Sequence, residues 1–270
     1  MKFGVCNEIF QEWDDFERTC DYVSDVGYDG IEIAPFTFAP HVKDITKEHR
    51  DKILKCTQEN NLEVIGLHWL LVGPEGLHIT CPDDDVRKTT ADYLLDLVHL
   101  CGEIGGTRMI FGSPMQRNIE EGQAYQEAFD NSRRVFEHIL PACEEYGITF
   151  CMEQLSKQET NFCQTAEETV DLIDSINHPN FQLLLDVKAM VDEPAGRPDT
   201  IKQYKKYLKH FHANDENLKG PGFGEVDFEP IFGALKDIDY DGYVSVEVFD
   251  FEVGCVAIAG QSFEHMKKFI

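Results

Sequence analysis

The chain has 270 residues, of which 42% are hydrophobic, enough for a full core and unlike the composition of a disordered protein. It carries 50 acidic against 24 basic residues, a net charge of −26, which disfavours binding to nucleic acid or to an anionic membrane. No apolar run approaches the ~20 residues of a membrane span. The nine cysteines include no CxxC pair and cannot all pair with one another, which is typical of a reduced, cytoplasmic protein.

Short apolar strands and longer amphipathic helices alternate from one end of the chain to the other. The expected strands cover residues 2–6, 31–34, 63–69, 108–112, 148–153, 181–186, 209–212 and 243–248. The expected helices cover residues 14–26, 46–60, 83–104, 121–146, 166–176, 200–208, 228–238 and 260–269. This alternation indicates a parallel sheet, and eight such units predict an α/β fold, the (β/α)8 TIM barrel, as a single domain spanning 1–270.

Four consecutive strands end on, or contain, a side chain that is costly to bury. The segment ITFCME closes on Glu153, FQLLLD closes on Asp186, the next strand ends at His212, and VSVEV contains Glu247. These residues are roughly 30 positions apart, the length of one strand–helix unit, so they should meet on one rim of the barrel. Because three buried carboxylates repel one another, their convergence with an imidazole predicts a divalent-metal site. Mostly oxygen ligands favour Mn²⁺, Co²⁺ or Mg²⁺, with Zn²⁺ as a further option.

Other polar and aromatic residues fall at the same rim. His68 and Trp69 end the third expected strand, so they face the mouth of the barrel; His68 is either a substrate contact or a histidine of the core. Glu32, in the second strand, contacts substrate or supports the site by hydrogen bonding. Lys188, two residues after the Asp of the metal set, either contacts substrate or is solvated on a loop.

Two polar neighbours of His212 receive a structural interpretation. His210 shares its face of the strand, but lies two residues deeper, where core packing is expected. Asn214 comes directly after the strand; it is a candidate for the site, although helix capping or turn formation is the role we expect.

The whole chain resembles the xylose isomerase-like TIM barrels, the sugar (phosphate) isomerase/epimerase superfamily. The resemblance rests on the segment GYDGIEI (27–33), the strand ends at 153, 186 and 212, the PGFG loop (221–224) and the segment YDGYVSVEVF (240–249). In site layout the ketose 3-epimerases are most similar. In that group a Glu, an Asp, a His and a Glu hold a Mn, Co or Mg ion.

The resemblance implies specific roles for residues of this chain. It implies that the metal ligands are Glu153, Asp186, His212 and Glu247, and that the two glutamates also exchange protons on opposite faces of the substrate carbon. It implies that Glu159, six residues after the first ligand, contacts the sugar.

The sequence departs from the epimerase pattern at two substrate positions. The epimerases carry a His three residues after the metal Asp, where this chain has Ala189. They carry an Arg six residues after the metal His, where this chain has Leu218. Both absent groups would contact substrate rather than metal, and Lys188 could supply a replacement polar contact.

The predicted activity is that of a metal-dependent sugar isomerase or epimerase, which removes a proton next to a carbonyl through a metal-stabilised enediolate. If a neighbouring hydroxyl leaves instead, the protein is a dehydratase or lyase, of the inosose dehydratase or keto-glycoside lyase type. A non-catalytic sugar-binding subunit is a remoter alternative. An apurinic-type endonuclease uses the same barrel, but its additional histidines are missing here. The expected partner is a small-molecule sugar, and the resemblance also implies a possible homo-oligomer.

Overall fold

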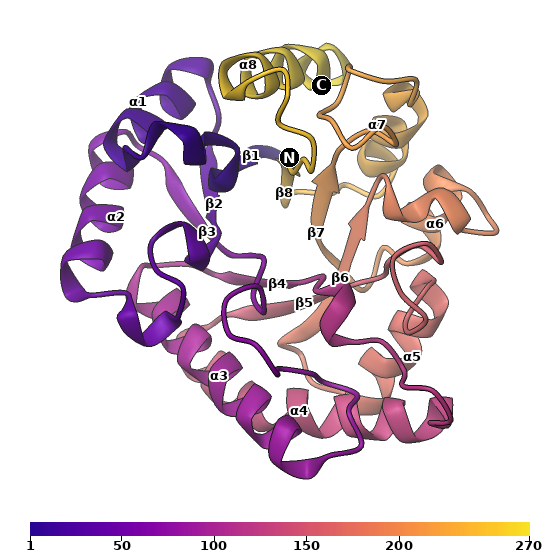
Figure 1. Cartoon of the computed structure of the whole chain (residues 1–270). Helices are drawn as coiled ribbons and strands as arrows, with labels where there is room; N and C mark the ends of the chain where they lie inside the picture. The colour runs from indigo at the N-terminus through magenta and orange to yellow at the C-terminus, as the bar shows by residue number, and fades with distance from the viewer.

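Eight parallel strands form a closed ring that is surrounded by helices, as Figure 1 shows for the computed structural model of residues 1–270. The strands follow one another around the ring in sequence order, and the ring is closed by parallel pairing of β8 with β1. The (β/α)8 TIM barrel predicted from the sequence is confirmed. None of its helices is both long enough and apolar enough to cross a membrane.

The elements of the barrel alternate without interruption. The strands are β1 (Lys2–Cys6), β2 (Gly30–Ile33), β3 (Glu63–Leu67), β4 (Arg108–Phe111), β5 (Thr149–Glu153), β6 (Phe181–Asp186), β7 (Leu208–Ala213) and β8 (Tyr243–Val246). The helices are α1 (Phe16–Val26), α2 (Lys47–Glu59), α3 (Asp84–Glu103), α4 (Tyr125–Tyr146), α5 (Ala166–Ile176), α6 (Arg197–Gln203), α7 (Phe228–Asp237) and α8 (Cys255–Met266). A 3-10 helix, η1 (Asn7–Trp13), follows the first strand.

Two helices differ from the sequence prediction. Helix α6 was expected at 200–208 but spans Arg197–Gln203, because Pro198 occupies its first turn, where the missing N–H costs no hydrogen bond. Helix α8 was expected at 260–269 but begins at Cys255, directly after Gly254, whose φ of 81° ends the preceding loop. Strands β3 and β8 also end earlier than expected, so the residues that follow them lie on the rim.

The starts of the helices have a local cause in the sequence. Five of the eight begin at an Asp or Thr whose side chain accepts hydrogen bonds from backbone N–H groups of the first turn. Such caps satisfy donors that have no partner within the helix. The capping residues are Asp15, Thr46, Asp83, Thr165 and Asp227.

The alternation of side chains along each strand separates two environments. One set packs outward against the helices, within a core cluster of 70 buried residues. The other set points into the barrel, where Ile110, Cys151 and Leu184 form a small apolar layer of their own. Because side chains on one face recur every second residue, Glu153 and Asp186 lie in the layer above Cys151 and Leu184. The apolar layer therefore supports the polar rim from below.

We predict that Gly66→Ala destabilises the barrel. A Cβ at this position of β3 would lie 1.8 Å from the carbonyl oxygen of Arg108 on β4, and backbone cannot move aside as a side-chain end can. The expected loss in free energy of unfolding is about 1–3 kcal/mol, the usual result of overpacking. The control is Gly233→Ala in α7, where a Cβ meets no atom within 4 Å and where the exchange should stabilise by about 0.5–1 kcal/mol. Denaturant unfolding measures both, and equal effects would contradict the prediction.

Candidate metal centre and active site

The four predicted ligand side chains meet at the mouth of the barrel. Glu153 and Asp186 are the last residues of β5 and β6, His212 is the last but one of β7, and Glu247 directly follows β8. One ligand atom from each of the four residues can be chosen so that all lie within 4.8 Å of one another, and all four residues are buried. The structure therefore brings together the set that the sequence predicted from strand ends alone.

The imidazole of His212 lies between two carboxylates. Its Nε2 is 3.2 Å from Oε2 of Glu32, and its Nδ1 is 3.0 Å from Oε2 of Glu247. A carboxylate that accepts the N–H of one ring nitrogen directs the lone pair of the other nitrogen toward a metal. If the imidazole proton is on Nε2, then Nδ1 carries a lone pair, as does Oε2 of Glu247. The 3.0 Å between these two atoms suits two ligands of one cation.

Glu32 itself is fully buried and connects two histidines. Its Oε1 lies 2.6 Å from Nε2 of His210, whose ring centroid is 5.1 Å from that of His212. Burial acts to raise the pKa of Glu32, but the two histidines together hold it well below its ordinary value. His210 is therefore a buried residue, as expected from its depth, but it takes part in the polar network beneath the rim.

Backbone and amide donors hold Asp186 in place. The side chain of Asn214 donates to its Oδ2 at 2.5 Å, and the backbone N–H of Ala189 donates to its Oδ1 at 2.7 Å. Asn214 also accepts from the backbone N–H of Lys188 at 2.8 Å. Of the two roles considered for Asn214, the structure favours the one in the site over turn formation, because its amide orients a carboxylate of the quartet.

The position of Glu153 depends on two residues that no sequence pattern indicated. Arg117 is fully buried and donates to the backbone carbonyls of Glu153 at 2.8 Å and Phe111 at 3.0 Å, which ties β5 to β4 at the rim. A Cβ on Gly112 would lie 2.5 Å from Oε2 of Glu153, so glycine leaves the space that this carboxylate occupies. Neither residue has a signal in a single sequence, since both act through contacts across strands.

The electrostatics of the quartet suit a divalent cation. Burial, followed by the charges of Glu247 and Asp186, raises the pKa of Glu153 well above its ordinary value. Burial raises the pKa of Asp186 to about 6. Burial also acts to raise the pKa of Glu247, but His212 and His68 lower it overall. A divalent cation would offset the charges that oppose one another here, and three carboxylates with one imidazole are a donor set that binds such ions.

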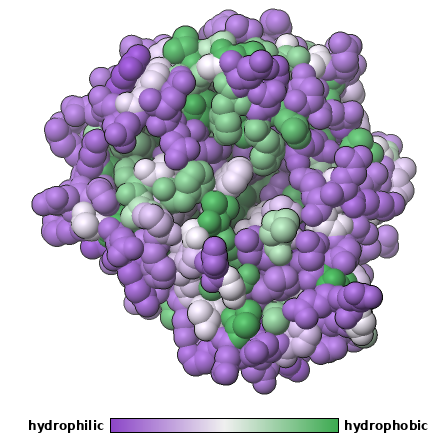
Figure 2. Space-filling view, viewed as in Figure 1, coloured by the Kyte–Doolittle hydropathy of each residue, from purple (hydrophilic) through white to green (hydrophobic).

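A cavity of about 360 Å³ opens onto the quartet. Figure 2 shows hydrophobic residues gathered around the hollowed middle of one face of the molecule, with hydrophilic residues around them. Two backbone positions with positive φ, Trp69 and Ser113, are part of its wall. The lining residues are Trp69, Val72, Ile110, Gly112, Ser113, Pro114, Met115, Gln116, Glu153, Leu155, Glu159, Glu247 and Phe249. Apolar walls with a few convergent polar groups are typical of small-molecule sites.

The predicted substrate contacts divide into two groups. Trp69 and Glu159 line the cavity, and Lys188 forms an ion pair with Glu159. His68 and Glu32 are fully buried and do not line it. The imidazole of His68 faces Glu8 and Glu247, and the carboxylate of Glu32 faces two histidines. A supporting position fits both residues better than contact with substrate.

A sequence model described as "Xylose isomerase-like TIM barrel" matches residues 20–269. The chain belongs to this family. Among its relatives, the D-psicose 3-epimerase of Ruminiclostridium cellulolyticum is 29% identical over 260 residues, covering 92% of this chain and 84% of that protein. The L-ribulose 3-epimerase of Methylomonas sp. is 31% identical over 229 residues, covering 84% and 76%.

Solved structures of the same group share the fold. The D-psicose 3-epimerase of Clostridium cellulolyticum H10, crystallised with D-tagatose, superposes with a TM-score of 0.83 at 22% identity, covering 100% of this chain and 99% of that one. The predicted family resemblance is confirmed. The named relatives are epimerases, a class of isomerase, and the prediction of an isomerase is confirmed at that level.

We expect Glu32→Gln to weaken binding of Mn²⁺ by about 10–100-fold, the usual result of losing a carboxylate that orients a ligating histidine. The change keeps the shape of the side chain and removes the charge that holds His212. Isothermal titration with MnCl₂ measures the affinity. The control is Glu63→Gln on the neighbouring strand, at a side chain that pairs with Lys2 outside the site. Unchanged affinity in Glu32→Gln would show that this carboxylate does not position the ligand.

Proposed function

We propose that this chain is a divalent-metal-dependent ketose 3-epimerase. The observation that carries the proposal is that two glutamates of a four-residue ligand set, Glu153 and Glu247, also line a cavity at the barrel mouth. The relatives named D-psicose 3-epimerase and L-ribulose 3-epimerase support the same assignment. The proposed substrate is a small ketose.

The proposed metal ligands are Glu153, Asp186, His212 and Glu247. Their hard oxygen donors favour Mn²⁺, Co²⁺ or Mg²⁺, with Zn²⁺ as a further option. When bound, such an ion supplies Lewis-acid polarisation of the ketose carbonyl and stabilises negative charge on its oxygen.

The proton transfers fall to the two glutamates. One carboxylate removes the proton from C3, and the electrons of the broken C–H bond form the C2–C3 double bond of an enediolate. The other carboxylate returns a proton to the opposite face of C3, which inverts that centre. Glu153 on β5 and Glu247 after β8 are separated around the ring by β6 and β7, so they enter the cavity from different sides, as the two proton transfers require.

The cavity wall provides the proposed contacts with the sugar. Trp69 and Phe249 have ring centroids 6.0 Å apart and offer apolar surface to the carbon skeleton. Lys188 lies with its Nζ 4.5 Å from the centroid of the Phe249 ring and pairs with Glu159. Glu159 is held in turn by the hydroxyl of Ser156, which donates to it at 2.7 Å. This pair offers hydrogen bonds to sugar hydroxyls, and Lys188 is proposed to replace the polar contact that is lost at the neighbouring Ala189.

Glu32 and His68 are proposed to orient the ligands and not to touch the sugar. A cytoplasmic location and a homo-oligomeric state stay predictions. The product distinguishes an epimerase from a lyase, because epimerisation yields another ketose and dehydration yields an enone.

We expect wild-type protein in D₂O to exchange the C3 hydrogen of D-psicose for deuterium while it forms D-fructose. Glu153→Gln and Glu247→Gln should each lower the rate by about 10²–10⁴-fold, the usual contribution of a general base. Mass spectrometry and chromatography of the sugars measure exchange and inversion, with metal content determined for each variant. The exposed Glu264→Gln on α8 is the control.

An enone absorbance without an epimer would contradict the proposal and identify a dehydratase or lyase. Tests on L-ribulose and D-tagatose, under the same conditions, extend the comparison to other ketoses. Absence of exchange with every ketose, in protein that holds its metal, would contradict an epimerase altogether.

We predict that Lys188→Met raises KM for the preferred ketose by about 10–100-fold, the equivalent of one hydrogen bond from a charged group. Metal content should not change, because the Lys188 side chain is not among the ligands. Lys188→Arg should restore part of the affinity. The exposed Lys157→Met is the matched control on the neighbouring loop. Steady-state kinetics measure KM for each variant. An unchanged KM in Lys188→Met would rule out contact between Lys188 and the substrate.

A further inference from the structure

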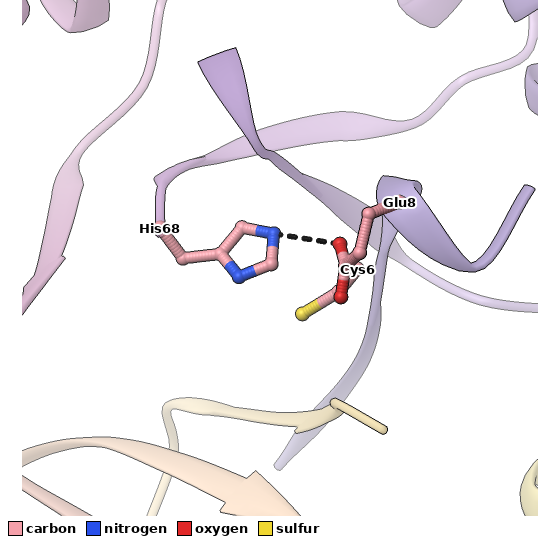
Figure 3. Close-up of side chains that lie close together, drawn as sticks. All are labelled: Cys6, Glu8 and His68. Atoms are coloured by element: carbon pink, nitrogen blue, oxygen red, sulfur yellow. Dashed lines mark ion pairs between the residues drawn. The ribbon is translucent and has the colours of Figure 1, made fainter. Parts of the chain in front are cut away.

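A second group of potential ligands lies beside the quartet and shares no residue with it. Cys6 ends β1, Glu8 lies in η1 and His68 directly follows β3. One ligand atom from each can be chosen so that all three lie within 4.8 Å of one another, and the three residues are 0%, 4% and 0% exposed. Figure 3 shows the sulfur, the carboxylate and the imidazole turned toward one another.

The polar side chains of this group form ion pairs but no well-aligned hydrogen bonds. Nε2 of His68 lies 2.9 Å from Oε2 of Glu8, but the two groups are not aligned as a hydrogen bond. Neither oxygen of Glu8 and neither nitrogen of His68 has any hydrogen-bond partner. The ion pair with His68 offsets part of the cost of burying Glu8, but both of its carboxylate oxygens still lack a donor in hydrogen-bond geometry. Two ligands of one ion also lie close together without forming a hydrogen bond to each other, and the contact of 2.9 Å between His68 and Glu8 fits such an arrangement.

The Cys6 thiol is the third potential ligand of this group. It is fully buried at the end of β1. Burial, with the charges of Glu32 and Glu8, raises the pKa of this thiol. Coordination to a divalent cation overrides such a preference, because a coordinated thiol is deprotonated outright and its proton passes to solvent.

We propose that Cys6, Glu8 and His68 form a second divalent-cation site, distinct from the quartet and selective for Zn²⁺. A thiolate, an imidazole nitrogen and a carboxylate oxygen are the donors of tetrahedral zinc sites. Bonds of about 2.0–2.3 Å place such donors about 3–4 Å from one another, and the three ligand atoms lie within 4.8 Å of one another. A thiolate also favours zinc over the harder ions that suit the quartet.

The geometry connects the new site to the first one. With Nε2 of His68 on the ion, its Nδ1 lies 3.6 Å from Oε1 of Glu247. Glu247 would then orient His68 in the way that Glu32 orients His212. The second ion would thus fix the position of a proposed catalytic carboxylate from the side away from the quartet. The existence of the site does not depend on the proposed epimerase activity.

The test uses the full-length chain, stripped of metal and then loaded with Zn²⁺ alone or with Co²⁺ alone. Elemental analysis after dialysis should give two equivalents of zinc per wild-type chain and one for Cys6→Ser. Loading with Co²⁺ should give a near-ultraviolet thiolate-to-cobalt absorption that Cys6→Ser abolishes. Cys151→Ser, which changes another buried thiol of the barrel interior, should keep the absorption. Asp186→Asn, which disrupts the quartet, should lose one equivalent and keep the absorption.

The outcomes separate this site from the first. A single equivalent in wild type with no thiolate absorption would overturn the proposal, and so would an absorption that persists in Cys6→Ser. Glu8→Gln provides a second variant if Cys6→Ser does not fold, and it should lower zinc affinity at the thiolate site by at least tenfold. None of these readouts uses catalytic activity, so failure of the epimerase proposal would leave them unchanged.

Discussion

The mutual repulsion of three buried carboxylates is the constraint on which the rest of this structure depends. Glu153, Asp186 and Glu247 reach within a few ångströms of one another because each ends or directly follows a strand of a closed barrel, and the barrel fixes those ends on one rim. The polypeptide does not neutralise all three: His212 serves Glu247, while Glu153 keeps a strongly raised pKa through burial and its acidic neighbours. A bound cation would offset the repulsion among these carboxylates. A cation beside a small cavity is suited to carbonyl chemistry.

A layer of supporting contacts holds this arrangement. Glu32 joins two histidines beneath the rim, Asn214 holds Asp186, and Arg117 fixes the backbone that carries Glu153. Each contact fixes a side chain by hydrogen bonds from a different strand or loop, so the closed ring supports the site as well as enclosing it. In the proposed second site, Glu247 would orient His68 as Glu32 orients His212.

The strand ends could be predicted from the sequence because their physics is local. A carboxylate that closes an apolar run, repeated at the interval of one strand–helix unit, is visible in one dimension, and so are the Asp and Thr caps of five helices. Arg117 and Gly112 could not be found in this way, and neither could the contact of Asn214 with Asp186, since these roles exist only across strands. Cys6 and Glu8 were not singled out either, because a thiol in an apolar strand is typical of an ordinary core. The early start of α8 was missed because its first turn follows a loop glycine rather than a polar cap.

The central claim is that one cation is held by Glu153, Asp186, His212 and Glu247. The most direct measurement is anomalous X-ray scattering at the manganese edge from crystals of the protein grown with MnCl₂. The account predicts one strong anomalous peak enclosed by the three carboxylates and Nδ1 of His212. A map with no peak among these four side chains, from crystals in saturating Mn²⁺, would contradict it.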